Sequence, residues 1–263
     1  MTTLPRTTVS FVIPAYNEAA NVEEVVRRSL AMLEQHTAGG EVIVVDDGSR
    51  DATGAIIERL AAEFPGRVRT IHHAQPIGCH PSMWRGSLIA SCEWIFFIPA
   101  DKQIIPEELP KFLAVAADAD LVCSYRRRRA DPWYRRFVGR TYNLLERVLL
   151  GLPLDDTHSS VLLRTAVVRV IAPAIRSMSA ILPIEIAARA LYSGFRLQQI
   201  EINHYPRTAG VPTGITSKDI LRLPGDLAAF AWQIHAIRRA ARATTSGQLA
   251  TTIPTPTEGT ADR

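Results

Sequence analysis

The sequence predicts an α/β fold in which a mostly parallel central sheet carries helices on both faces. Three observations lead to this prediction. Short apolar runs of strand length recur along the chain, and segments with apolar residues at helical spacing separate them. Strands that alternate with helices pair in parallel, because each helix carries the chain back across the sheet. Finally, 263 residues with 47% hydrophobic and 21% charged side chains suit a globular chain with a large core.

The first half of the chain alternates strand and helix. Residues 9–13 form an apolar run that stops at Pro14, and residues 41–45 form another that stops at Asp46. Between them, residues 18–35 carry Val and Leu side chains at helical spacing. Asp51 is placed to cap the next helix. The same patterns predict further helices over residues 52–63, 81–91 and 107–117, and further strands over residues 68–72, 94–98 and 119–124.

The second half of the chain is richer in predicted helix. A long amphipathic helix is expected over residues 131–150, and a strand over residues 195–202. Residues 244–263 are rich in Thr, Pro, Gly and Ala without periodicity, which is typical of a disordered tail. We therefore expect a single domain over residues 1–243. Its remaining predicted helices cover residues 166–176, 183–193 and a stretch that follows a loop at residues 209–214.

Charge and cysteine content exclude several classes of protein. Thirty Lys and Arg against 26 Asp and Glu give a net charge of +4, which does not indicate a nucleic-acid binder. Three scattered cysteines are too few for a disulfide framework and suit a reducing cytoplasm. The sequence shows neither a secretory signal nor a run of roughly 20 apolar residues, so we expect a cytoplasmic protein without a membrane span.

Polar clusters follow three of the predicted strands. They are Pro-Ala-Tyr-Asn-Glu at residues 14–18, Asp-Asp-Gly-Ser at residues 46–49 and Asp-Lys-Gln at residues 101–103. The carboxyl ends of parallel strands meet at one edge of a sheet, so these clusters should share one crevice. Carboxylates there can bind a nucleobase or ribose and hold a divalent cation against a diphosphate. One such cluster could be a turn and helix cap, but three in register favour a nucleotide site.

These motifs resemble the inverting family 2 glycosyltransferases, and within them the polyprenyl (dolichyl) phosphate mannosyl and glucosyltransferase branch. The resemblance runs over roughly residues 8–215 and rests on residues 12–18, residues 44–51 and Asp101 with Gln103. It implies the nucleotide-diphospho-sugar transferase fold, a Rossmann-like, GT-A type domain. It also implies a UDP- or GDP-sugar donor, bound by Pro14, Ala15, Tyr16, Glu18, Asp46, Asp47 and Asp101.

The resemblance assigns a divalent cation, Mg²⁺ or Mn²⁺, to Asp101 with help from Gln103. The family usually carries Asp-x-Asp-x-Gln at this point, and here Pro99 stands where the first Asp is expected. With one carboxylate and one amide, the cation must take its other ligands from diphosphate oxygens and water.

Arginines mark the expected acceptor side. Arg126 ends a segment that resembles the family's Asp-Leu-Val-x-Gly-x-Arg, and Arg207 lies in a segment that resembles its closing His-x-Pro-Arg. Arg207 is suited to bind phosphate and to close over the donor. Arg136 and Asn143 lie in the helix over residues 131–150, which resembles the family's Arg-rich helix. The implied acceptor-binding residues are Arg126, Arg136, Asn143 and Arg207.

The helix over residues 131–150 has two interpretations. Arg136, Arg140 and Arg147 share one face, opposite a face with Val138 and Leu145. A basic amphipathic helix can lie on an anionic membrane surface, and it can equally cover the core of a soluble protein. The first interpretation predicts peripheral association with the inner face of the cell membrane.

Two carboxylates bear on the identity of the acceptor. The resemblance places Asp156 and Glu185 on the acceptor side, where a helix cap or surface charge is the alternative for each. A hydroxyl acceptor needs a general base, whereas a polyprenyl phosphate is already anionic and needs arginines. The arginines at residues 126–147 favour the phosphate. The candidate catalytic residues are Asp101, Asp156, Glu185 and Arg207.

The sequence thus predicts an inverting glycosyltransferase that moves a sugar from a UDP- or GDP-sugar to an acceptor, with polyprenyl phosphate favoured. Two alternatives stay open: transfer to a soluble hydroxyl acceptor, such as a nucleoside, a saccharide or a secondary metabolite, and a non-catalytic sugar-nucleotide binder. A sugar-1-phosphate nucleotidyltransferase should instead carry a glycine-rich basic loop after the first strand, where this chain has residues 14–18.

Overall fold

The fold is taken from a computed structural model that describes residues 7–126, 151–152, 154, 156, 159–207, 225, 230–232 and 234–235. Three sequence predictions lie outside these residues: the helix over residues 131–150 with Arg136 and Asn143, the loop at residues 209–214, and the tail over residues 244–263. The helical stretch expected between that loop and residue 243 also lies mostly outside them. Within the described part, no helix combines the length and the apolar character that a membrane span needs.

The described strands form one seven-stranded sheet in the order β3-β2-β1-β4-β6-β5-β7. Strand β6 runs antiparallel to both of its neighbours, and the other neighbouring pairs are parallel. This mixed, mostly parallel sheet confirms the predicted fold class. The strands are β1 (Thr8–Ala15), β2 (Gly39–Asp46), β3 (Val68–His72), β4 (Trp94–Phe97), β5 (Leu121–Arg126), β6 (Val161–Arg164) and β7 (Leu197–Ile202).

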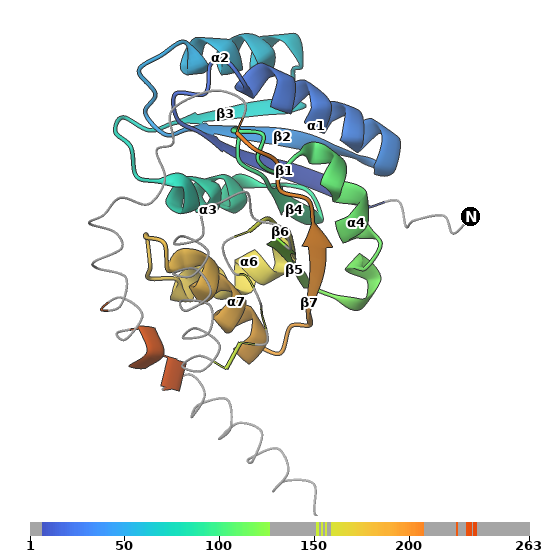
Figure 1. The fold of residues 1–263 in the computed structure, drawn as a ribbon, viewed down its shortest axis with the longest axis vertical. Helices are drawn as coiled ribbons and strands as arrows, with labels where there is room; N and C mark the ends of the chain where they lie inside the picture. Colours follow the sequence, from blue (N-terminus) through green and yellow to red (C-terminus); the bar gives the residue numbers. More distant parts are fainter. Residues whose placement is uncertain are drawn as a thin grey trace, which may run out of the picture.

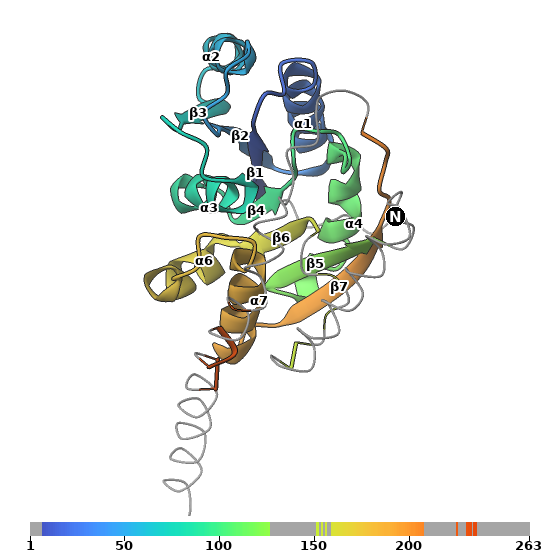
Figure 2. The same ribbon diagram turned by 60° about the vertical axis from the view of Figure 1, so that its left-hand side comes forward.

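Helices cover both faces of the sheet (Figures 1 and 2). One face carries α1 (Val22–His36), α2 (Thr53–Glu63) and α4 (Leu109–Leu113), and the other carries α3 (Cys79–Ile89), α6 (Thr165–Ile171) and α7 (Leu182–Tyr192). Side chains alternate along each strand, so Phe11 and Ile13 of β1 join the first core while Val12 joins the second. Short 3₁₀ turns span Pro106–Glu108, Ala116–Asp118 and Ala172–Ala174.

Several element boundaries differ from the sequence prediction. Strand β6 is absent from the prediction, because four residues are too few to show a periodic pattern. The single helix expected over residues 107–117 is instead two 3₁₀ turns flanking α4. Strand β1 continues through Pro14, whose carbonyl accepts a hydrogen bond from the N–H of Ala100 at 3.3 Å. Pro14 has no N–H to donate, but its carbonyl still links β1 to the segment after β4.

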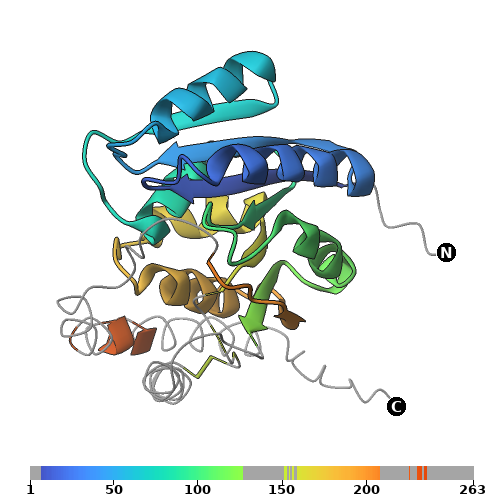
Figure 3. The same ribbon diagram turned by 45° about the horizontal axis from the view of Figure 1, so that its top comes forward.

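The boundaries of two helices shape the crevice. Helix α1 begins at Val22 rather than at residue 18, which leaves Glu18 in the loop after β1. Helix α2 begins at Thr53. Oδ1 of Asp51 accepts two hydrogen bonds from Thr53, one from the backbone N–H at 3.0 Å and one from the hydroxyl at 2.5 Å. Strands β1 and β2 lie side by side with their arrowheads at the same end (Figure 3). Their following loops therefore lie at one edge of the sheet.

Candidate active site

The loops after β1 and β2 are bound to each other. The N–H of Asn17 donates to Oγ of Ser49 at 2.9 Å, and the N–H of Glu18 donates to Oγ1 of Thr53 at 2.9 Å. The carbonyl of Ala15 accepts from the N–H of Asp47 at 2.8 Å. Two of the predicted polar clusters therefore form one side of a crevice.

Pro14, Ala15 and Tyr16 differ in what they can offer a ligand. Pro14 and Ala15 are buried and hold neighbouring loops through their carbonyls. Tyr16 is half-buried. Its aromatic ring is thus the part of this segment that a nucleobase could contact.

Arg207 connects the two sides of the crevice. Its guanidinium donates to Oε1 of Glu18, and its Nη1 lies 3.7 Å from Oδ2 of Asp101. Glu18 follows β1, Asp101 follows β4, and Arg207 follows β7. The segment that carries Arg207 is tied down nearby, since the N–H of Tyr205 donates to the carbonyl of Gln103 at 2.9 Å. Three of the predicted site residues thus form a single charged group.

Burial raises the pKa of Glu18 above its ordinary value. The nearby charges of Asp101 and Asp51 act in the same direction, whereas a 2.7 Å hydrogen bond from Nδ2 of Asn21 and the charge of Arg207 partly offset it. Glu18 is 5% exposed. Because burial makes the charged form of Glu18 unfavourable, that form needs a nearby cation. Arg207 supplies it, and the two side chains stabilise each other in the crevice.

Asp46 ends β2, Asp47 follows it, and the two side chains face different partners. Oδ1 of Asp46 accepts from the N–H of Ser49 at 2.9 Å, and its Oδ2 lies 3.2 Å from Nδ1 of His72. Asp47 accepts from the N–H groups of Ile77 and Gly78, both at 2.8 Å. Asp46 therefore connects the loop after β2 with the end of β3, while Asp47 anchors the loop that leads into α3.

Asp101 and Gln103 offer oxygen ligands for a hard cation. Oδ1 of Asp101 accepts from the N–H of Gln103 at 3.0 Å, and the positive φ of 61° at Lys102 makes the tight turn between them. No group of three or more His, Cys, Asp or Glu side chains able to hold a metal ion occurs within the described residues. One carboxylate and one amide fit Mg²⁺ or Mn²⁺, which take their remaining ligands from phosphate and water.

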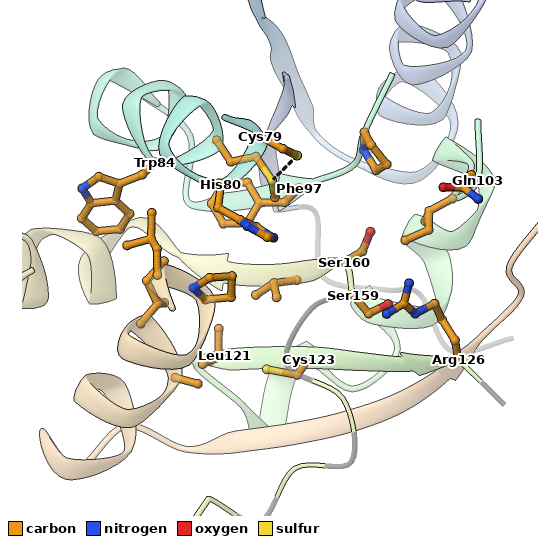
Figure 4. A pocket seen from close by; sticks show the side chains of 18 of the residues that line it. Cys79, His80, Trp84, Phe97, Gln103, Leu121, Cys123, Arg126, Ser159 and Ser160 are labelled. Atoms are coloured by element: carbon orange, nitrogen blue, oxygen red, sulfur yellow. Dashed lines mark hydrogen bonds between the residues drawn. The ribbon is translucent and has the colours of Figure 1, made fainter. Parts of the chain in front are cut away.

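A cavity of about 290 Å³ lies next to Gln103, between α3, α7 and the strands β4 to β6 (Figure 4). Its polar end carries Gln103, Arg126, Ser159 and Ser160, and Trp84 lies toward the opposite end. The sequence did not indicate that Ser159 and Ser160 line a cavity. They do so because they directly precede β6, a strand that was not predicted. The mainly apolar remainder of the lining is Cys79, His80, Met83, Trp84, Phe97, Pro99, Ile104, Leu121, Cys123, Val161, Leu182, Pro183, Ile186, Ala187 and His204.

Arg126 and Asp156, predicted for separate roles, form an ion pair. Nε of Arg126 donates to Oδ2 of Asp156 at 2.9 Å, and Nη2 donates to Oδ1 at 3.3 Å. The side chains are 16% and 3% exposed. This fork geometry sets the guanidinium plane at the polar end of the cavity.

Glu185 does not join the residues that line the cavity. It is fully buried, and its carboxylate accepts from the N–H groups of Arg176 at 3.2 Å and Ser177 at 2.7 Å and from Nε of Arg189 at 2.7 Å. Leu182, Pro183, Ile186 and Ala187 of the same helix face the cavity instead. These contacts are those of a structural carboxylate, and the catalytic role predicted for Glu185 stays a prediction.

A family model described as glycosyl transferase family 2 matches residues 10–171. This segment is more than half of the 263 residues and contains the β1, β2 and β4 ends that form the crevice. The chain belongs to glycosyl transferase family 2. The predicted family is thereby confirmed.

Two curated relatives are each similar to more than half of the chain. The undecaprenyl-phosphate 4-deoxy-4-formamido-L-arabinose transferase of Sodalis glossinidius is 36% identical over 150 residues, which are 56% of this chain and 46% of the relative. The transferase of the same name from Pseudomonas fluorescens is 34% identical over 149 residues, which are 56% of this chain and 44% of the relative. The matches span less than half the length of these relatives.

Solved structures share the fold at low sequence identity. Glucosyl-3-phosphoglycerate synthase of Mycobacterium tuberculosis, in complex with Mn²⁺, UDP and glucosyl-3-phosphoglycerate, has a TM-score of 0.55 and 21% identity over 89% of this chain and 80% of that one. TarS of S. aureus, in complex with UDP-GlcNAc, has a TM-score of 0.52 and 18% identity over 78% of this chain and 62% of that one. These likenesses agree with the GT-A-like fold.

Proposed function

We propose that this chain is an inverting glycosyltransferase that moves a sugar from a nucleotide diphosphate sugar to a polyprenyl phosphate. The observation that carries the proposal is the meeting of Glu18 and Asp101 with Arg207 at the carboxyl ends of β1 and β4, with Asp46 at the end of the neighbouring strand β2. The names of the curated relatives support a polyprenyl phosphate acceptor, and the UDP in related folds supports a nucleotide donor.

The donor is proposed to lie across the strand ends. Its nucleoside would contact Tyr16 and the carboxylate of Asp46, and its diphosphate would lie between Asp101 and Arg207. Arg207 is the cation of the described group, and it can exchange its contact with Glu18 for bidentate contacts to phosphate oxygens. Asp101 and Gln103 are proposed to hold a divalent cation, which when bound neutralises the leaving diphosphate.

The acceptor is proposed to use the cavity. An anionic phosphate suits the polar end, where Arg126 presents a guanidinium oriented by Asp156. An apolar chain suits the end near Trp84, because a hydroxylated ligand there would bury polar groups without hydrogen-bond partners. The lining therefore favours a phosphate with an apolar chain over a soluble hydroxylated acceptor.

The proposed reaction is a single displacement. A phosphate oxygen of the acceptor forms a bond to the anomeric carbon as the bond from that carbon to the donor diphosphate breaks, and the configuration inverts. No proton needs to be removed from the acceptor, since its oxygen is already anionic. The chain's residues then act by holding the two phosphates in line and stabilising the charge of the leaving group.

The site of action is proposed to be the inner face of the cell membrane, where the helix expected over residues 131–150 would rest on anionic lipid. This element lies outside the described residues, and its arginine face is a sequence inference.

The proposal is tested with the full chain, UDP- and GDP-sugars, manganese and a short-chain polyprenyl phosphate. Transfer to the lipid phosphate is expected, and Arg126→Ala should lose roughly tenfold or more in kcat/KM for the acceptor, the effect of one charge-assisted contact. Transfer to a hydroxyl acceptor, with a loss of about 10²- to 10⁴-fold in Asp156→Asn and a near-normal Arg126→Ala, would support the soluble-acceptor alternative. Donor binding without transfer to either acceptor would identify a non-catalytic binder.

A further inference from the structure

His72 lies outside every motif that the sequence analysis assigned to function. It ends β3, next to the end of β2, and its ring stands between two carboxylates. Nδ1 lies 3.2 Å from Oδ2 of Asp46, and Nε2 lies 2.7 Å from Oε1 of Glu58 on α2. The charged groups that face the ring from the packed elements are therefore Asp46 of β2 and Glu58 of α2.

Both of these contacts require hydrogens on the ring. An ionised carboxylate only accepts hydrogen bonds, and a neutral imidazole carries one N–H and one bare nitrogen. A neutral His72 can satisfy one of the two carboxylates and turns a lone pair toward the other. The doubly protonated ring donates to both.

The ring's surroundings favour that charged form. The hydrogen bond to Glu58 and the charge of Asp46 raise the pKa of His72, although its partial burial opposes them. Glu58 is itself fixed by a 2.7 Å hydrogen bond from Oγ1 of Thr70. The first turn of α2 closes the remaining side, since a Cβ on Gly54 would lie 3.2 Å from Oδ2 of Asp46 and 3.7 Å from Cε1 of His72.

We propose that His72 is a positioning residue whose protonated ring holds the Asp46 carboxylate in the orientation that binds the nucleoside of the donor. The inference rests on the proposed function, because it takes Asp46 as a donor contact. Each carboxylate oxygen has two acceptor sites. After the contacts to Ser49 and His72, one site on each oxygen is left for a ligand.

A pH dependence of donor binding follows. Below the raised pKa of His72 the ring is charged and the orientation of Asp46 is held. As the pH rises through that pKa, the neutral ring keeps its shorter hydrogen bond to Glu58 and loses the longer one to Asp46, so the affinity for the donor falls. The affinity for the acceptor should not follow this titration, because four strands of the sheet separate β3, which carries His72, from β5, which carries Arg126.

The experiment measures binding of UDP and of GDP to the full chain by calorimetry from pH 6 to pH 9, together with the KM for the donor sugar. For the nucleotide that binds, the wild-type Kd should rise roughly tenfold across the titration, the effect of one lost charge-assisted hydrogen bond. His72→Phe should show the weak Kd at every pH. His72→Asn, whose side-chain amide can donate from the place of Nδ1, should bind tightly at every pH.

Glu58→Gln provides a second test that leaves His72 in place. The amide oxygen can still accept from Nε2, but the negative charge is gone, so the pKa of His72 should fall and the rise in Kd should move to lower pH. Glu63→Gln, on the same helix and paired with Arg27, is the matched control and should leave the profile unchanged. The ring of His72 followed by NMR should titrate at the same pH as the change in Kd.

The outcomes separate the two proposals. If neither nucleotide binds at any pH, the proposed donor site is wrong, whatever His72 does. If a nucleotide binds with a Kd that is independent of pH, or if His72→Phe binds as tightly as wild type, the donor site stands and the role of His72 is overturned. The role is also overturned if Glu58→Gln shifts the NMR titration of the ring without shifting the binding profile.

Discussion

Replacing Glu185 by Gln should destabilise the fold and leave the chemistry largely intact. The carboxylate is fully buried and accepts from two backbone N–H groups and from the guanidinium of Arg189, whose side chain is 12% exposed. Gln keeps one acceptor oxygen and turns an NH₂ group toward N–H donors, so at least one buried donor loses its partner. Breaking a buried pair on one side costs about 3–5 kcal/mol. For a chain of this size, roughly 3 kcal/mol lowers the Tm by about 6–12 °C.

Urea denaturation gives the free energy of unfolding of this variant directly. The midpoint should fall with an unchanged m-value, and Glu34→Gln is the matched control. Glu34 is 63% exposed in a surface pair with Arg67, so its loss should cost at most about 1 kcal/mol. The rate is then measured well below both transitions, where kcat of Glu185→Gln should stay within a few-fold of wild type. A wild-type urea midpoint with a rate lower by about 10²- to 10⁴-fold would refute this reasoning and identify Glu185 as a general base.

Three further predictions concern the metal, the membrane and the core. Asp101→Ala should abolish transfer and leave the urea midpoint unchanged. Pro99→Asp should lower the manganese concentration that gives the half-maximal rate. Full activity of Asp101→Ala, or full activity of the wild type in EDTA, would contradict a metal role. The full chain should sediment with anionic vesicles at low salt and be released as salt screens Arg136, Arg140 and Arg147. Each of these arginines should contribute about 1 kcal/mol to the free energy of membrane binding. Absence of binding at low salt would favour the interpretation in which this helix covers the core. Gly86→Ala should destabilise the fold by about 1–3 kcal/mol in urea, because its Cβ would lie 2.5 Å from Cγ1 of Val12; an unchanged midpoint would show that α3 can shift freely.

The sequence was sufficient for most of the strand and helix alternation and for the meeting of polar clusters at the strand ends. Both are local properties: an apolar run predicts a buried strand, and the polar residues directly after it lie at the strand's carboxyl end. Glu18, Asp46 and Asp101 were predicted on this ground, and the structure brings the loops after β1, β2 and β4 together. The family resemblance rests on the same short motifs, and the family match confirms it.

The partners of these residues were decided by tertiary structure. Arg207 meets Glu18 across 189 positions of sequence, and Arg126 meets Asp156 across 30. The antiparallel strand β6 exists because β4 and β5 bind it from both sides, and its four residues carry no periodic signal of their own. Glu185 was predicted for catalysis, with a helix cap or a surface charge as the alternative, and only the packing of α7 shows that its side chain is fully buried. Local sequence determines the backbone conformation that a segment prefers. The partner of a charged side chain depends instead on how distant segments pack. Once the side chain is buried, that partner determines whether the charged form is stable.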